Sequence, residues 1–137
     1  MEETARSIGW SASAAHPPSG HYALGVTATR ISSWIPVVLW AAVIFTLSSV
    51  PDLGTGLGTW DTILRKLAHT AEYALLGALL YRAVRNAPAA LLLASAYAVT
   101  DEIHQTFVSG RYGSPVDWLI DTAGAAIGVA ITVRVWR

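Results

Sequence analysis

The sequence of residues 100–105, TDEIHQ, stands inside an apolar run that is otherwise typical of a membrane-spanning helix. An ionisable side chain in hydrocarbon costs at least about 2–3 kcal/mol, and such residues are by default candidates for function. Three ionisable groups within six residues therefore mark this stretch as a candidate functional site.

The composition of the chain is that of a membrane protein. Of 137 residues, 53% are hydrophobic and 13% are charged, whereas soluble domains carry about 25% charged residues. The formal net charge is zero and no long basic run occurs, so nucleic acid is not an expected partner. The chain has no cysteine, which excludes disulfides and thiolate metal sites. One small integral membrane domain is the expected class.

Four apolar segments predict an all-α fold, with about four transmembrane helices in one antiparallel bundle. The helices are expected over about residues 31–50, 67–84, 89–108 and 116–136, because about 20 apolar residues cross the hydrocarbon core. Residues 1–30 show no sustained period and are predicted to form a flexible cytoplasmic tail. Pro36 is expected near the start of the first helix, where a missing backbone donor is tolerated.

Polar residues in these segments share helical faces. The same spacing of i, i+3 and i+4 occurs twice, in His69, Glu72 and Tyr73, and again in Asp101, His104 and Gln105. In the last segment, two carboxylates and two glycines fall on one face: Asp117, Asp121, Gly124 and Gly128. The glycine pair allows a neighbouring helix to approach closely. Glu102 lies off its helix's polar face and is expected to pair with Arg111 or Lys66.

The distribution of basic residues predicts an orientation. With four spans, six of them share a side with both termini (Arg6, Arg30, Arg82, Arg85, Arg134 and Arg137), and three lie opposite (Arg65, Lys66 and Arg111). Lys and Arg are in excess in cytoplasmic loops, so both termini are expected in the cytoplasm. The polar ends of three helices then meet at one depth and form a polar cavity open to the outer surface.

Several motifs resemble the VanZ-like family over about residues 34–131. They are Phe45-x-x-Ser48-Ser49, Lys66-x-x-His69-x-x-Glu72-Tyr73, Asp101-Glu102-x-His104-Gln105-x-Phe107-x-x-Gly110-Arg111, and Ser114-x-x-Asp117-x-x-x-Asp121-Thr122-x-Gly124. Ser109 departs from the family, which often has proline before Gly-Arg. The resemblance implies a small multi-pass protein of the bacterial cytoplasmic membrane, in a family named for a member linked to teicoplanin resistance. The family has no established biochemical mechanism.

The candidate site residues fall into two sets. Those assigned to catalysis are His69, Glu72, Asp101 and His104, and those assigned to substrate binding are Lys66, Tyr73, Glu102, Gln105, Arg111, Asp117 and Asp121. The first set is also the candidate ligand set for a divalent metal, because imidazole and carboxylate suit Zn, Mn, Fe or Ni. Without a metal, a His and acid pair can perform acid/base chemistry while Arg111 and Lys66 neutralise a phosphate or carboxylate.

Three functions remain open from sequence. The first is handling of a membrane lipid, a lipid-linked envelope component or a glycopeptide antibiotic at the outer surface. The second is metal-dependent hydrolysis of a lipid phosphate or ester. The third is a non-catalytic binding or scaffold protein whose polar network only fixes helix packing. Asp117 also has a structural alternative, which is to cap the fourth helix.

Overall fold

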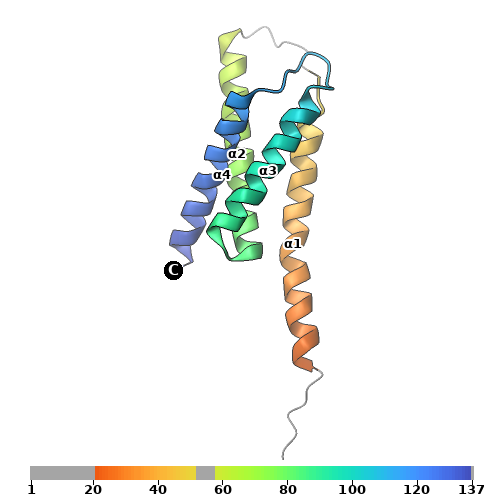
Figure 1. Cartoon of the computed structure of the whole chain (residues 1–137), viewed down its shortest axis with the longest axis vertical. Helices are drawn as coiled ribbons and strands as arrows, with labels where there is room; N and C mark the ends of the chain where they lie inside the picture. Colours follow the sequence, from red (N-terminus) through yellow and green to blue (C-terminus); the bar gives the residue numbers. More distant parts are fainter. Residues whose placement is uncertain (1–20, 52–57, 137) are drawn as a thin grey trace, which may run out of the picture.

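The chain folds into four helices and, in the described residues, no strand. The computed structural model describes residues 21–51 and 58–136, with side chains from residue 32. The helices are α1 (His21–Ser48), α2 (Thr59–Val84), α3 (Ala87–Gln105) and α4 (Pro115–Val135). They form a bundle in which the starts of α2 and α4 lie at the same end as the ends of α1 and α3 (Figure 1). The predicted all-helical class is confirmed.

Two helices begin earlier than their apolar segments. Helix α1 begins at His21 rather than near residue 31, so the second part of the predicted tail, residues 21–30, is helical, while residues 1–20 lie outside the described chain. Pro36 is consequently inside α1 and not near its start. Helix α2 begins at Thr59 rather than near residue 67. Hydropathy marks only the apolar part of a helix, and a polar turn can extend it when side chains four residues apart pair, as Asp61 and Arg65 do.

The membrane-spanning prediction is supported in part. Among the described helices, Pro115–Val135 is long and apolar enough to cross a membrane, and Ser32–Ser48 is a shorter apolar stretch. The bundle also exposes many large apolar side chains, including Leu39 on α1, Leu64 on α2 and Leu92 on α3. Broad apolar surfaces of this kind mark contact with protein partners or with lipid.

Helices α2 and α4 run in the same direction and pack very closely (Figure 1). A Cβ added to Gly128 would collide with the backbone of Ala74, and one added to Gly124 would collide with Thr70. Gly77 on α2 meets the backbone of Ala125 in the same way. The predicted close approach through the Gly124 and Gly128 pair is confirmed, and the neighbour is α2.

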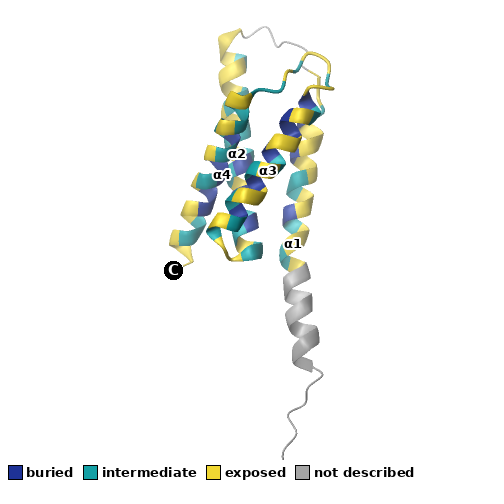
Figure 2. Cartoon of the chain, in the orientation of Figure 1, coloured by how far each residue is buried: buried dark blue, intermediate teal, exposed yellow. Residues whose placement is uncertain are grey.

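The core is built from small residues around a few large ones. Helix α3 buries an alanine stripe of i, i+4 spacing, formed by Ala90, Ala94 and Ala98. Tyr73 and Leu76 of α2 belong to the same core and are almost fully buried, and Figure 2 shows buried positions on all four helices. Helix α1 packs on α2 and α3 and, in its described part, makes no contact with α4. The small side chains let the helices approach, as is usual at helix contacts in membranes.

Replacing Gly128 by valine is expected to lower the thermal stability of the protein. The new Cβ would meet the Ala74 carbonyl, and backbone atoms yield poorly; overpacking typically costs about 1–3 kcal/mol. The readout is the melting temperature of detergent-purified protein by size-exclusion chromatography. The matched control is Ala130→Val, at an exposed position of the same helix. It should have the same melting temperature as the wild type. If Gly128→Val also has the melting temperature of the wild type, the close packing of α2 and α4 is contradicted.

Candidate functional site

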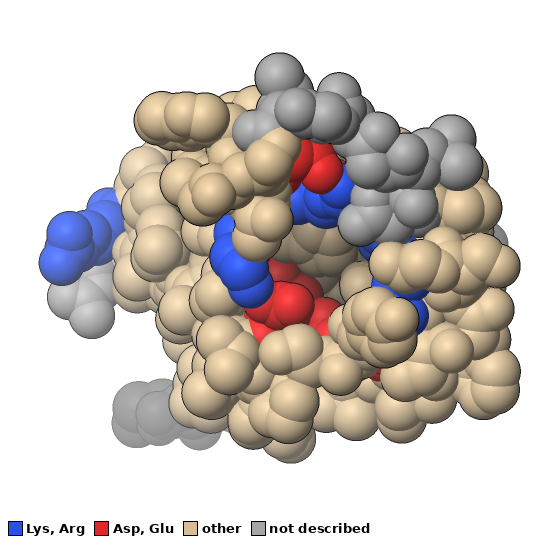
Figure 3. All heavy atoms as spheres, turned by 90° about the horizontal axis from the view of Figure 1, so that it is seen from above, with Lys and Arg blue, Asp and Glu red and all other residues tan. Residues whose placement is uncertain are grey.

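A pocket of about 390 Å³ lies where α2 and α4 begin and α3 ends. Seen from this end, Lys, Arg, Asp and Glu side chains gather around a hollow in the surface (Figure 3). Its volume falls within the range of about 300–1,000 Å³ that is usual for small-molecule sites. Its lining comes from α2, from the end of α3 and the segment that follows it, and from the first turns of α4.

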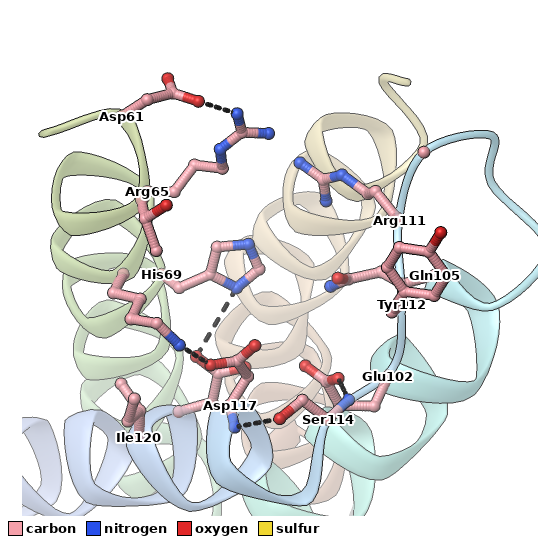
Figure 4. A pocket seen from close by; sticks show the side chains of 14 residues that line it. Asp61, Arg65, His69, Glu102, Gln105, Arg111, Tyr112, Ser114, Asp117 and Ile120 are labelled. Carbon is pink, nitrogen blue, oxygen red and sulfur yellow. Dashed lines mark hydrogen bonds and ion pairs between the residues drawn. The ribbon is translucent and has the colours of Figure 1, made fainter. Parts of the chain in front are cut away.

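Two basic residues of α2 stand on one side of the pocket, each beside an acid. Arg65 pairs with Asp61 of its own helix, and Lys66 pairs with Asp117 of α4 (Figure 4). Both pairs are partly exposed, so each contributes little to stability. A charged ligand can therefore compete for these cations at low energetic cost.

Arg111 faces this pair from the segment between α3 and α4 (Figure 4). Its Nη1 donates a hydrogen bond of 3.2 Å to the backbone carbonyl of Ser48, at the end of α1. A guanidinium group carries five N–H donors in a planar fork. The contact with Ser48 fixes the orientation of Arg111 and leaves donors available for a phosphate or carboxylate in the pocket.

His69 and Asp121 lie deeper in the pocket. The Nδ1 atom of His69 is 3.5 Å from Oδ1 of Asp121, at the outer limit of a hydrogen bond (Figure 4). Asp121 is fully buried, and within the described chain neither of its carboxylate oxygens accepts a hydrogen bond. Buried carboxylates are normally hydrogen-bonded or paired. This under-compensated acid is the strongest local sign of a ligand-binding position.

Glu102 holds the start of α4. Its Oε2 accepts a 2.6 Å hydrogen bond from the backbone N–H of Ser114, while its buried Oε1 has no partner in the described residues. The predicted pairing with Arg111 or Lys66 was wrong, because the turn before α4 brings Ser114 to the carboxylate. Ser114 itself caps α4, because its Oγ accepts hydrogen bonds from the backbone N–H groups of Val116 and Asp117. The capping role considered for Asp117 thus belongs to Ser114.

A second polar group, centred on Asp101, joins α1 to α3 and touches the pocket lining only through Gln105. Asp101 Oδ2 accepts hydrogen bonds from Ser48 Oγ at 2.8 Å and from Gln105 Nε2 at 3.1 Å. All three side chains are buried. Sequence reasoning placed Asp101 in the site but did not identify Ser48 as its partner, although the Phe45-x-x-Ser48-Ser49 motif carried that signal. The hydrogen bond from Ser48 joins α1 to α3, so Asp101 contributes to packing, while its buried Oδ1 has no partner in the described residues.

His104 also lies apart from the pocket. Its Nε2 is 2.9 Å from Ser49 Oγ, and its ring stacks on Phe45 with centroids 4.2 Å apart. Ser49 donates its single hydroxyl hydrogen to the Phe45 carbonyl at 2.7 Å, so His104 Nε2 acts as the donor toward Ser49. This arrangement holds the end of α1 against α3.

Glu72 and Tyr73 do not line the pocket either. The backbone carbonyl of Glu72 accepts a 2.9 Å hydrogen bond from Trp40 Nε1, which joins α2 to α1. Tyr73 is fully buried in the core with its ring 6.3 Å from that of Tyr97. The shared face predicted for His69, Glu72 and Tyr73 therefore runs from the pocket into the core.

The predicted site residues divide accordingly. Seven line the pocket: Lys66, His69, Glu102, Gln105, Arg111, Asp117 and Asp121. Four do not: Glu72, Tyr73, Asp101 and His104. Among the described residues no three His, Asp or Glu side chains form a group able to hold a metal ion. The hypothesis of a metal on His69, Glu72, Asp101 and His104 gains no support from this geometry.

The fold and site define a small helical bundle with one polar, mixed-charge pocket at its end. A family model described as VanZ/LLP1 matches residues 13–137. The chain belongs to this family. No curated protein and no solved structure matches the chain.

Ser48→Ala is expected to destabilise the protein by about 1–3 kcal/mol, because it removes a donor from the buried carboxylate of Asp101. Thr46→Ala is the matched control. Its hydroxyl bonds the Ala42 carbonyl in the same helix and is exposed. The measurement is the melting temperature of both variants in detergent. If the two variants have the same melting temperature, the contact between Ser48 and Asp101 does not stabilise the fold.

Proposed function

We propose that this protein crosses the bacterial cytoplasmic membrane four times, with both termini in the cytoplasm, and binds the anionic head group of a lipid-linked envelope component in an outward-facing pocket. Membership of the VanZ/LLP1 family supports the envelope setting. The observation that carries the ligand class is the pocket itself, in which Arg65, Lys66 and Arg111 surround buried acids.

The two kinds of charge suit two parts of one ligand. Lys66 and Arg111 provide charge-assisted donors, and guanidinium in particular matches phosphate or carboxylate oxygens in pairs. Asp121 and Glu102 provide buried oxygens without hydrogen-bond donors in the described chain. Such oxygens can accept hydrogen bonds from hydroxyl or amino groups of a ligand. The pocket therefore fits a head group that carries an acid and neighbouring donors, such as a sugar or glycerol phosphate.

The membrane arrangement rests on apolar surface and on basic residues. The exposed apolar side chains on α1, α2, α3 and α4 would face lipid, and α4 has the length and composition of a span. With four spans, six of the nine Lys and Arg residues in the sequence would share a side with the termini, and three would lie on the pocket side. The excess on the first side favours a cytoplasmic location for the termini and an outer location for the pocket.

A purely structural role fits a different part of the molecule. The hydrogen bonds from Ser48 to Asp101 and from His104 to Ser49 join α3 to the end of α1, and none of these four residues lines the pocket. A glycopeptide antibiotic anchored in the membrane is the second candidate ligand, since its sugars and carboxylate present the same two chemistries as the lipid head group.

Single cysteines test the orientation, and the chain has none of its own. Tyr112→Cys, exposed at the pocket end, is expected to react with an impermeant thiol reagent in intact cells. Asn86→Cys, exposed in the turn between α2 and α3, should react only after the cells are opened. This position leaves the basic residues unchanged. Labelling of Asn86→Cys alone in intact cells would show that the orientation is the opposite of the proposed one. Labelling of both variants would show that the hairpin of α2 and α3 does not cross the membrane.

The head-group assignment predicts that purified protein binds sn-glycerol 3-phosphate through Lys66 and Arg111. A double variant, Lys66→Gln with Arg111→Gln, should bind at least about 100-fold more weakly, since each charged hydrogen bond contributes at least about 1.5 kcal/mol and about 1.4 kcal/mol is tenfold in affinity. The control is Arg82→Gln with Arg134→Gln, two exposed arginines at the other end of the bundle.

Thermophoresis gives the Kd of each protein. Equal affinity of the site and control variants, or no binding to wild type, would contradict the proposal. Repeating the titration with teicoplanin separates the two candidate ligands, because a glycopeptide site should show the same dependence on Lys66 and Arg111 with teicoplanin while binding glycerol phosphate poorly.

A further inference from the structure

An apolar groove of about 320 Å³ lies beside the polar pocket, between the end of α3 and the start of α4. Val99, Ile103 and Thr106 form its α3 side, and Pro115 and Trp118 form the opposite side. Val99 and Ile103 are exposed apolar residues. The groove carries no charged side chain apart from Glu102 at its edge, so its interior fits hydrocarbon.

The groove and the pocket share one wall. Glu102 and Ser114 line both cavities, and the 2.6 Å hydrogen bond from the Ser114 N–H to Glu102 Oε2 forms the contact between them. Gly113 lies directly on α3, since a Cβ at that position would collide with the Glu102 carbonyl. Glu102 and Ser114 therefore lie between the two cavities and border both of them.

The shared wall also contains a buried carboxylate oxygen that lacks a hydrogen-bond partner in the described residues. Glu102 is only 7% exposed, and its Oε1 lacks a partner in the described chain. A donor from a ligand that passes this point would complete the hydrogen bonding of that oxygen. Hydroxyl groups placed between a phosphate and a hydrocarbon chain are such donors.

Three other contacts between helices are closed by packing or hydrogen bonds. Glycines bring α2 against α4, Ser48 bonds Asp101 between α1 and α3, and Trp40 bonds the Glu72 carbonyl between α1 and α2. Between α3 and α4, by contrast, a chain attached to a head group in the pocket meets an apolar groove that can take part of its length.

We propose that the pocket and groove form one two-part site for a phosphate-bearing lipid, with the head group beside Lys66 and Arg111 and one hydrocarbon chain in the groove lined by Val99, Ile103 and Trp118. The inference rests on the proposed function and extends it to the substrate class. Charge complementarity selects the anionic end of the lipid, and the shared wall of Glu102 and Ser114 places the two cavities side by side, so that one lipid can reach both.

The test compares two ligands that differ in the hydrocarbon chain, dioleoyl phosphatidic acid and sn-glycerol 3-phosphate. Phosphatidic acid binding is measured by native mass spectrometry of the full-length protein released from detergent. Val99→Trp and Ile103→Trp fill the groove, and Leu92→Trp places the same ring on an exposed position of α3 outside both cavities. The groove variants should lose at least tenfold in phosphatidic acid affinity and keep wild-type affinity for glycerol phosphate, whereas Leu92→Trp should match wild type for both ligands.

The outcomes separate the two proposals. If both groove variants retain phosphatidic acid while the Lys66 and Arg111 double variant loses it, the head-group pocket stands and the chain groove is wrong. If the double variant also retains phosphatidic acid, the proposed function fails as well. Loss of both ligands in both groove variants would contradict a separate subsite for the chain.

Discussion

The glycine contacts between α2 and α4 are the constraint on which the site depends. Because no Cβ separates Gly124 and Gly128 from the backbone of α2, the two parallel helices are held in one register. That register places Lys66 beside Asp117 and His69 beside Asp121. Parallel neighbours need an antiparallel helix to return the chain, and α3 does so. Its last turn then delivers Glu102 and Gln105 to the same end.

The three buried acids differ in how many hydrogen bonds their carboxylates receive, although each keeps at least one buried oxygen without a partner in the described chain. Asp101 Oδ2 receives one side-chain hydrogen bond from Ser48 of α1 and one from Gln105 of its own helix, so its burial is partly offset and the bond from Ser48 also joins two helices. Glu102 receives one bond, and Asp121 has only a distant histidine. Polar networks that are fully satisfied rigidify a fold, whereas unsatisfied groups are costly. Glu102 and Asp121 line the pocket and Asp101 does not, so the unpartnered oxygens of Glu102 and Asp121 are the ones that a ligand in the pocket would complete.

The sequence predicted the features that follow from periodicity and topology. The glycine face of α4 and the meeting of polar ends from three helices needed only spacing and alternating direction. Contacts made by non-periodic residues were not predictable. Ser48 and Ser49 end α1 and reach Asp101 and His104 across the bundle, and the bond between Glu102 and Ser114 depends on the path of a short turn. For the same reason His104 was grouped with a pocket that it does not line.

The most direct measurement uses Lys66, which is the single lysine of the chain. Labelling with ¹⁵N-lysine gives one side-chain nitrogen signal, and solid-state NMR in bilayers can measure its dipolar coupling to ³¹P. With phosphatidic acid added to phosphatidylcholine, the phosphomonoester resonance is distinct from the bulk phosphodiester. We expect coupling of Lys66 Nζ to the phosphomonoester, which is abolished by Arg111→Gln and unaffected by Arg82→Gln. Coupling to bulk phosphodiester alone, or none, would contradict a head-group site.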